Sequence, residues 1–165
     1  MNDNQVYILS DEKGIGKTTA LQEWTKKSNN LSGFLSPIVK GKRQFQNIET
    51  GFLIPMETDA KDLIVGKYAF DLKSFKTIEE LILSYYKSSK SELIILDEIG
   101  PLEIYKDQGF HNLLLQLKAE YATNKSKLFF VVRASVLNDF ITKYNFKNEV
   151  VFNLKEFKAK FINHK

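Results

Sequence analysis

The chain has 165 residues, of which 43% are hydrophobic and 13% aromatic, so it is long enough to bury one sizeable core. We therefore expect a single domain over residues 1–165. The sequence contains no cysteine, which excludes disulfides and thiolate metal sites. Its net charge is +4 at pH 7, but the lysines are spread along the whole chain, which favours a solvated lysine-rich surface over a specific nucleic-acid-binding face.

The amino-terminal sequence MNDNQVYILSDEK has acidic and amide residues where a secretory signal would carry positive charge, so the expected location is the cytoplasm. The longest apolar runs, such as residues 129–132 (FFVV), are far too short to cross a bilayer. We expect a soluble monomer without a membrane partner.

The chain begins with a predicted strand, loop and helix. Residues 5–10 (QVYILS) form a short apolar run rich in strand formers, which ends directly at a glycine-rich loop. From Thr18 the pattern changes to helical spacing, with Ala20, Leu21 and Trp24 on one face.

The next segment predicts antiparallel structure. Residues 33–55 form extended stretches interrupted by Gly41, Gly51 and Pro55, and residues 63–72 (LIVGKYAFDL) continue them. We therefore predict an antiparallel hairpin insert from roughly Ser32 to Asp71, followed by a helix over residues 75–87.

The second half alternates between strands and helices. Residues 93–96 are apolar at every position, which is typical of a strand covered on both faces in a parallel sheet. Further strands are predicted at residues 127–133 and 150–154, and helices at 110–121, 135–144 and 155–162. This order predicts an α/β fold with a mainly parallel sheet between helix layers.

The loop after the first strand is a candidate phosphate-binding loop, or Walker A motif, with one glycine missing. In such loops backbone N–H groups surround the phosphates, with a lysine and a helix N-terminus beside them. The usual spacing places Gly16, Lys17 and Thr18 correctly, but Asp11 stands at the first glycine position. The alternative is a glycine-rich turn that merely opens a helix. The predicted binding residues are Lys13, Gly14, Ile15, Gly16, Lys17, Thr18 and Thr19, and Lys17 is also predicted to be catalytic.

Asp11 does not exclude a phosphate-binding loop. The first glycine often has a positive φ, which Asp tolerates better than most residues. A carboxylate pointing at a triphosphate would weaken binding, although Lys13 could offset the charge. We therefore predict that the Asp11 side chain faces away from the phosphates.

Two acids follow the buried strand and form a candidate Walker B motif. Asp97 is suited to hold Mg²⁺ opposite the Thr18 hydroxyl, and Glu98 to orient and polarise the attacking water. The alternative is a pair of solvated or helix-capping acids, but the preceding loop favours the catalytic interpretation.

Three segments together resemble the cancer-related nucleoside-triphosphatase family: GIGKTT, VGKYAFDLKSF at residues 65–75, and ILDEIGPLE at residues 95–103. The resemblance covers nearly the whole chain and implies a recombinase-like P-loop fold with slow, Mg²⁺-dependent hydrolysis of ATP, GTP and other nucleoside triphosphates. By position it implies that Asp97 binds the metal and Glu98 is the base. It also implies that Gly14, Gly16, Lys17, Thr18 and Thr19 bind phosphates. Members typically have glycine at the position of Asp11 and often proline at that of Lys13.

The two arginines of the chain are further candidates. Arg133 ends the strand expected between the first strand and the Asp-Glu strand, where it could stabilise transition-state charge at the γ-phosphate or pair with a carboxylate such as Glu98. Arg43 lies in a predicted hairpin, where it could act as a lid contact or an arginine finger, although such residues are more often solvated.

Asn153 and Lys155 are weaker candidates for base contacts, and His111 and His164 lack metal-ligand spacing.

Three functions fit these residues. A nucleoside-triphosphate hydrolase is favoured because Glu98 directly follows the expected metal ligand. A nucleotide or small-molecule kinase would normally have more arginines to clamp its acceptor. A nucleotide sensor with little turnover is compatible with Asp11 in the loop.

Overall fold

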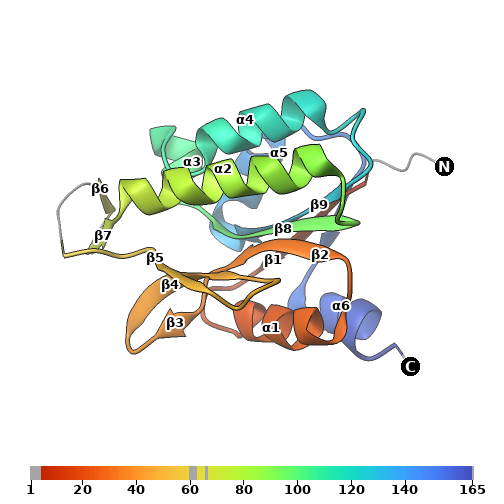
Figure 1. The fold of residues 1–165 in the computed structure, drawn as a ribbon, viewed down its shortest axis with the longest axis horizontal. Coiled ribbons are helices and arrows are strands. Elements are labelled where there is room, and N and C mark those ends of the chain that lie inside the picture. Colours follow the sequence, from red (N-terminus) through yellow and green to blue (C-terminus); the bar gives the residue numbers. More distant parts are fainter. Residues whose placement is uncertain (1–4, 60–62, 66, 165) are drawn as a thin grey trace.

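The computed structural model describes residues 5–59, 63–65 and 67–164, and within them eight strands form one sheet (Figure 1). The sheet strands are β1 (Val6–Asp11), β2 (Leu31–Leu35), β3 (Ile38–Val39), β4 (Lys42–Asn47), β5 (Leu53–Pro55), β8 (Leu93–Ile99), β9 (Lys127–Arg133) and β10 (Glu149–Phe152). A separate hairpin consists of β6 (Leu63–Val65) and β7 (Tyr68–Phe70). The helices are α1 (Lys17–Lys27), α2 (Leu72–Ser88), α3 (Pro101–Lys106), α4 (His111–Glu120), α5 (Leu137–Tyr144) and α6 (Leu154–Phe157).

The centre of the sheet is parallel, as predicted. Its strand order is β10-β1-β9-β8-β2, and every neighbouring pair in this series is parallel. The expected position of β9 between β1 and β8 is confirmed. The carboxyl ends of these strands therefore meet at one edge of the sheet, where ligands bind in open α/β folds.

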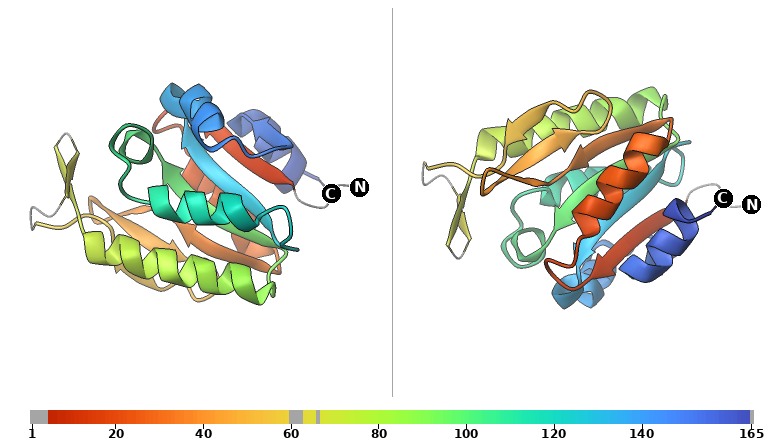
Figure 2. Two further views of the ribbon diagram at one scale, coloured as in Figure 1. Left: turned by 90° about the horizontal axis from the view of Figure 1, so that it is seen from above. Right: turned by 90° about the horizontal axis from the view of Figure 1, so that it is seen from below.

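Helices cover both faces of this sheet. Helices α1 and α6 lie on one face, and α2, α4 and α5 lie on the other (Figure 2). A hydrophobic core lies on each face of the sheet, and the side chains of β8 alternate between them. Ile94 and Leu96 pack on the α2 side, and Leu93 and Ile95 pack on the α1 side. The predicted burial of residues 93–96 on both faces is thus confirmed, and Trp24 is a core residue, 8% exposed.

The predicted insert begins too early. Residues 31–35 form β2, which runs parallel to β8 and belongs to the central sheet, so the antiparallel part starts only after Leu35. Strands β3 and β5 then pair antiparallel with β4 at the sheet edge. The error has a physical reason, because the pairing partner of a short strand is set by tertiary packing and not by its own residues.

Several element ends also differ from the prediction. The last strand stops at Phe152 instead of residue 154, because Asn153 caps α6 by accepting a hydrogen bond from Glu156 N. The predicted helix 155–162 is α6 followed by one π-helical turn (Lys158–Ile162). The short helix α3 was not predicted and begins at Pro101, a residue suited to the first helical turn.

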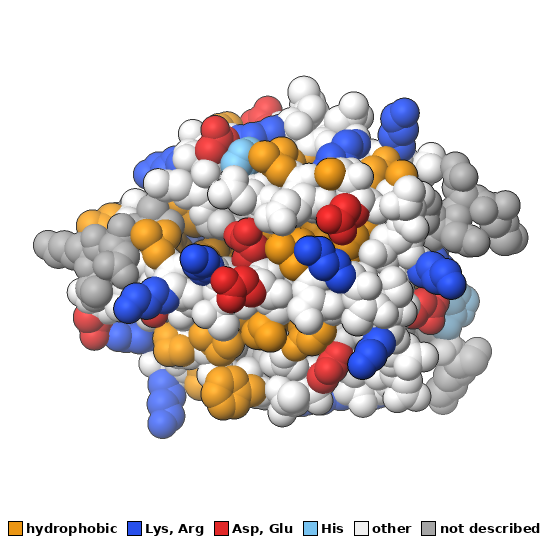
Figure 3. Space-filling model, turned by 45° about the horizontal axis from the view of Figure 1, so that its top comes forward, with side chains coloured by type: hydrophobic (Ala, Val, Ile, Leu, Met, Phe, Trp, Pro, Cys, Tyr) orange, Lys and Arg blue, Asp and Glu red, His pale blue; other side chains and the backbone are white. Residues whose placement is uncertain are grey.

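The segment VGKYAFDL forms β7 and the start of α2. Asp71 caps α2, since its side chain accepts hydrogen bonds from the backbone N–H groups of Lys73 and Ser74. Gly66 of this segment lies outside the described residues. On the face covered by α2 and α4, basic and acidic side chains are interspersed (Figure 3).

No helix in the described ranges has both the length and the apolar character needed to cross a membrane.

Candidate active site

The loop between β1 and α1 has the backbone of a phosphate-binding loop. Gly14 and Gly16 have φ angles of 78° and 100°, in the left-handed region that side chains with a Cβ disfavour. Gly16 is also the N-cap of α1, so the free N–H groups of the first helical turn face the loop. An anion in this loop would meet both the amides and the positive end of the helix.

Lys17 lies within this loop and is 9% exposed. Its ammonium donates to the backbone carbonyl of Asp11 at 2.8 Å and also to that of Glu12. Burial lowers the pKa of Lys17, and the nearby Glu98 carboxylate is the largest opposing influence. The lysine is thus held over the loop by neutral acceptors, which a phosphate oxygen could replace.

Asp11 belongs to β1, and its carboxylate is bound away from the loop. One oxygen accepts from Glu12 N at 2.8 Å and the other from Leu154 N at 3.0 Å, at the start of α6. These two hydrogen bonds, with Leu154 first, hold the pKa of Asp11 below its usual value. Its φ is not positive, so this position has no backbone requirement for glycine.

Asp97 lies opposite Thr18, as the sequence predicted. The Thr18 hydroxyl donates to Asp97 Oδ2 at 2.8 Å, and Ser36 N donates to the same oxygen at 3.0 Å. Asp97 is 2% exposed, and its Oδ1 has no hydrogen-bond partner among the residues described. Burial, followed by the charge of Glu98, raises its pKa. A buried carboxylate oxygen without a partner beside a hydroxyl suits a hard cation.

Glu98 has a strained backbone at a β-bulge. Between β8 and β9 the register shifts from Leu96 paired with Phe130 to Ile99 paired with Val132, so β8 carries one extra residue. Glu98 has a φ of 74°, which is uncommon for a residue with a side chain. Such strain is often found at functional sites, where it directs a side chain that a regular strand would place elsewhere.

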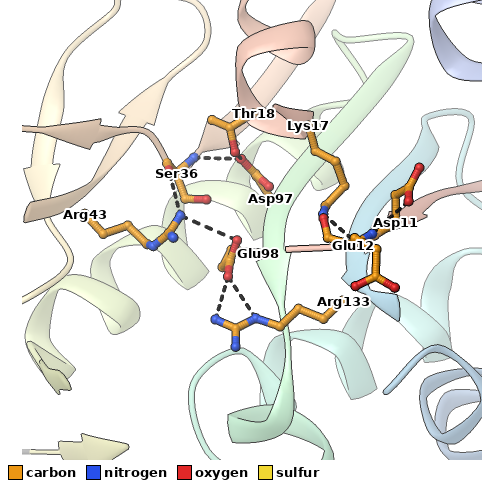
Figure 4. Close-up of polar contacts among 9 residues, drawn as sticks. All are labelled: Asp11, Glu12, Lys17, Thr18, Ser36, Arg43, Asp97, Glu98 and Arg133. Carbon is orange, nitrogen blue, oxygen red and sulfur yellow. Dashed lines mark hydrogen bonds and ion pairs between the residues drawn. The ribbon is translucent and has the colours of Figure 1, made fainter. Parts of the chain in front are cut away.

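The two arginines of the chain both bind Glu98 (Figure 4). Arg133 donates to Oε1 from Nε at 3.0 Å and from Nη2 at 2.7 Å. Arg43 lies 3.5 Å from Oε2 and donates to the carbonyl of Ser36 at 2.9 Å. The Glu98 side chain is 15% exposed, so both ion pairs are shielded from water.

A cavity of about 300 Å³ lies between the loop after β1 and the Glu98–Arg43 pair. It is lined by the phosphate-loop residues Lys13, Gly14, Gly16, Lys17, Thr18 and Thr19 and by Gln22, Ser36, Pro37, Ile38, Arg43 and Glu98. Ile15, predicted within the binding loop, does not line it, and its side chain is exposed to solvent. Ser36 was not predicted, because nothing in its sequence context links it to Asp97.

The remaining candidates lie in other environments. The interpretation of Arg43 as a solvated hairpin residue is wrong, since its side chain is only 18% exposed. For Arg133 the salt-bridge alternative is the one observed. Asn153 uses its side chain to cap α6, and His111 contacts the Tyr144 hydroxyl at 2.8 Å. A base contact by Lys155 stays a prediction.

Comparison with known proteins matches nearly the whole chain to one family. A family model described as NTPase matches residues 6–164. The nucleoside-triphosphatase THEP1 of Sulfurisphaera tokodaii is 35% identical over 111 residues, which cover 61% of this chain and 63% of that protein. The nucleoside-triphosphatase THEP1 of Thermotoga sp. (strain RQ2) is 28% identical over 157 residues, covering 90% and 86%.

The fold also matches a solved structure. The crystal structure of THEP1 from the hyperthermophile Aquifex aeolicus superimposes with a TM-score of 0.69, over 91% of this chain and 89% of that one. Sequence identity is 19%, so this likeness concerns the fold alone.

Proposed function

Because the chain belongs to the NTPase family, as its resemblance predicted, we propose that it is a Mg²⁺-dependent nucleoside-triphosphate phosphohydrolase. It cleaves ATP, GTP and other nucleoside triphosphates to the diphosphate and phosphate, slowly and with little preference for the base. The observation that carries this proposal is that Glu98, whose backbone is strained, lines the same cavity as the phosphate loop.

The loop would hold the β- and γ-phosphates. Backbone amides from Gly14 to Thr19 would donate to the phosphate oxygens, and Lys17 would exchange its two carbonyl acceptors for them. The loop is preorganised for this exchange because Gly14 and Gly16 already have the left-handed conformation. Asp11 does not interfere, since its carboxylate is bound by Leu154 N.

Thr18 and Asp97 fit a magnesium ion. The described residues hold no group of three His, Cys, Asp or Glu that could enclose a metal, so phosphate oxygens and water would complete the coordination, as Mg²⁺ prefers. A bound Mg²⁺ would neutralise charge that develops on the phosphates. The partnerless Oδ1 of Asp97 supports this assignment.

Glu98 would act as the base toward the attacking water. Arg133 occupies its Oε1 with two hydrogen bonds, while Oε2 has only the 3.5 Å contact with Arg43. Oε2 is therefore the oxygen able to accept a proton from water. Arg133 acts through Glu98 in this arrangement, and Arg43, which lines the phosphate cavity, is the arginine better placed to contact the γ-phosphate.

Phosphate release from ATP, GTP, CTP and UTP tests the proposal, with Mg²⁺ or with EDTA. Glu98→Gln should lower turnover by about a hundredfold to ten-thousandfold, while nucleotide affinity measured by calorimetry stays within about threefold. Glu80→Gln, on the exposed face of α2, is the control and should change neither quantity.

Two outcomes would support another function. Tight nucleotide binding without phosphate release from the wild-type protein indicates a sensor. Loss of the γ-phosphate only when an acceptor is added indicates a kinase.

A further inference from the structure

A second cavity, of about 330 Å³, is bordered by Glu98 but not by the phosphate loop. Met56, Phe70, Phe75 and Leu102 contribute apolar walls, and Arg133 lines it together with Glu98. Arg43, in contrast, lines the phosphate cavity. The two arginines reach Glu98 from different directions (Figure 4), so this carboxylate separates a polar cavity from an apolar one.

The apolar cavity has aromatic walls suited to a flat ring. Phe70 lies edge-on to Phe75, with ring centroids 6.0 Å apart, and the Tyr68 ring lies 6.3 Å from that of Phe70. Phe70 and Tyr68 are only partly buried. An aromatic ligand would therefore cover exposed ring surface, which stabilises binding beyond simple area burial. The residues come from VGKYAFDL, the segment that the phosphate chemistry leaves without a role.

The same cavity offers positive charge for an anion. Lys67 has its ammonium 5.3 Å from the Tyr68 ring centroid, and no carboxylate in the described ranges pairs with it. Arg133 is the second cation. The buried Glu103 does not compete for them, because its two oxygens accept hydrogen bonds from Gly100 N and Phe110 N.

We propose that this cavity binds a small aromatic acid, with its ring against Phe70 and Tyr68 and its anionic group on Lys67 and Arg133. A guanidinium can form two parallel hydrogen bonds to a carboxylate or a phosphate, which gives this contact a defined geometry. The acid thereby takes from Glu98 the guanidinium that occupies Oε1. The structure thus assigns a second ligand site to the apolar cavity, on the side of Glu98 that Arg133 lines.

Occupation of this site activates hydrolysis, a step that rests on the proposed function. With Arg133 withdrawn, Oε1 of Glu98 becomes available, in addition to Oε2, to orient and deprotonate water. The binding step itself does not depend on hydrolysis and can be measured without nucleotide.

A set of three naphthalene compounds tests the binding step by calorimetry on the nucleotide-free protein. The probes are 1-naphthylacetate, 1-naphthyl phosphate and the uncharged 1-naphthylacetamide. Loss of the charged group should weaken binding at least about tenfold relative to the acetate, since a charge-assisted hydrogen bond contributes about 1.5–3 kcal/mol. Comparison of the acetate with the phosphate identifies which anion the site prefers. Equal binding of all three, or no binding, overturns the proposal.

Variants locate the probe. Lys67→Glu and Phe70→Leu should each weaken binding of 1-naphthylacetate at least about fivefold. Lys76→Glu, an equal charge change on the exposed face of α2, is the control and should change affinity less than about twofold. If Phe70→Leu unfolds, Lys67→Glu alone decides, because Lys67 is exposed. Displacement of the probe by ATP would place the nucleobase in this cavity and overturn the proposal.

The activation step is tested by phosphate release. Saturating 1-naphthylacetate should raise turnover severalfold in the wild-type protein and have no effect in Arg133→Gln, whatever the basal rate of that variant. Binding without activation overturns the regulatory step and leaves the site. Absence of hydrolysis under all conditions contradicts the proposed function, while the calorimetric result still decides the site.

Discussion

The phosphate loop and the Glu98 centre form the two ends of one candidate site, but they are held together in different ways. The loop is a contiguous segment whose shape depends on its own glycines and whose lysine is satisfied by carbonyls within six residues. Glu98 is held by arginines from β4 and β9, which lie 55 and 35 positions away in the sequence. The difference teaches that the loop is local and self-contained, whereas the arrangement around Glu98 depends on the packing of several strands.

The largest expected effect tests the local end. Replacing Lys17 by alanine removes the only side-chain cation buried within the loop, and we expect nucleotide affinity to fall by about a hundredfold to a thousandfold. Calorimetry with a non-hydrolysable triphosphate measures the effect. The unfolding free energy should change little, since no distant element depends on Lys17.

Lys26→Ala, in the exposed last turn of α1, serves as the control. A fall in nucleotide affinity of less than about threefold for Lys17→Ala would contradict the prediction. It would show that the backbone amides bind the phosphates without help from the lysine.

The second prediction concerns a buried carboxylate that supports the Glu98 end. Glu103 binds Gly100 N and Phe110 N, and a Cβ at Gly100 would lie 3.2 Å from Arg133 Nε, so this turn packs against the arginine. Burial raises the pKa of Glu103 from its ordinary 4.5 to about 7. Between these values the folded protein binds more protons than the unfolded chain, so the stability that Glu103 contributes is present at low pH and decreases as the pH rises towards 7.

Urea unfolding at pH 5 and pH 8 measures this loss. The wild type should lose about 2–3 kcal/mol more than Glu103→Gln between the two values, because the amide does not titrate. Any contribution from Asp97 is common to both proteins and cancels. Parallel pH curves for the two proteins would mean that Glu103 is ionised at all pH values tested.

The third prediction distinguishes a specific role of Arg43 from a general effect of surface charge. Arg43→Ala should lower turnover by about tenfold, because it removes the cation nearest to Glu98 Oε2 in the phosphate cavity. Lys42→Ala is the matched control on the same strand, since Lys42 pairs with the exposed Asp59. Equal effects of the two substitutions on phosphate release would indicate a general influence of surface charge and not a role of Arg43 at the γ-phosphate.

The same contrast explains what could be predicted from the sequence. The glycine loop at residues 14–18 and the buried strand that begins at Leu93 were predicted correctly as structural elements, because glycine spacing and continuous apolarity are local properties. The bulge at Glu98 and the convergence of Arg43 on it could not be predicted, because both depend on which strands pair and in which register. The parallel pairing of β2 was missed for the same reason. The shape of the loop could therefore be predicted from the sequence. Around Glu98 only the types of residue could be predicted, and not their arrangement.

The smallest expected effect returns to Asp11, the residue that departs from the usual loop. Since its φ is not left-handed and its carboxylate binds Leu154 N and Glu12 N, Asp11→Gly relieves no strain and removes two hydrogen bonds. We expect the unfolding free energy at pH 7 to fall by about 1 kcal/mol or less, because the side chain is partly exposed. The part of the effect that comes from the ionised carboxylate should disappear as the pH falls below the ordinary pKa of 3.8, since the lowered pKa means that the ionised form is the stabilising one. Nucleotide affinity should change less than about threefold in both Asp11→Gly and Asp11→Asn, because the charge points towards α6. A tenfold gain in both variants would mean instead that the carboxylate turns towards the phosphates when a nucleotide binds, and the loop would then depend on α6 as much as Glu98 depends on its arginines.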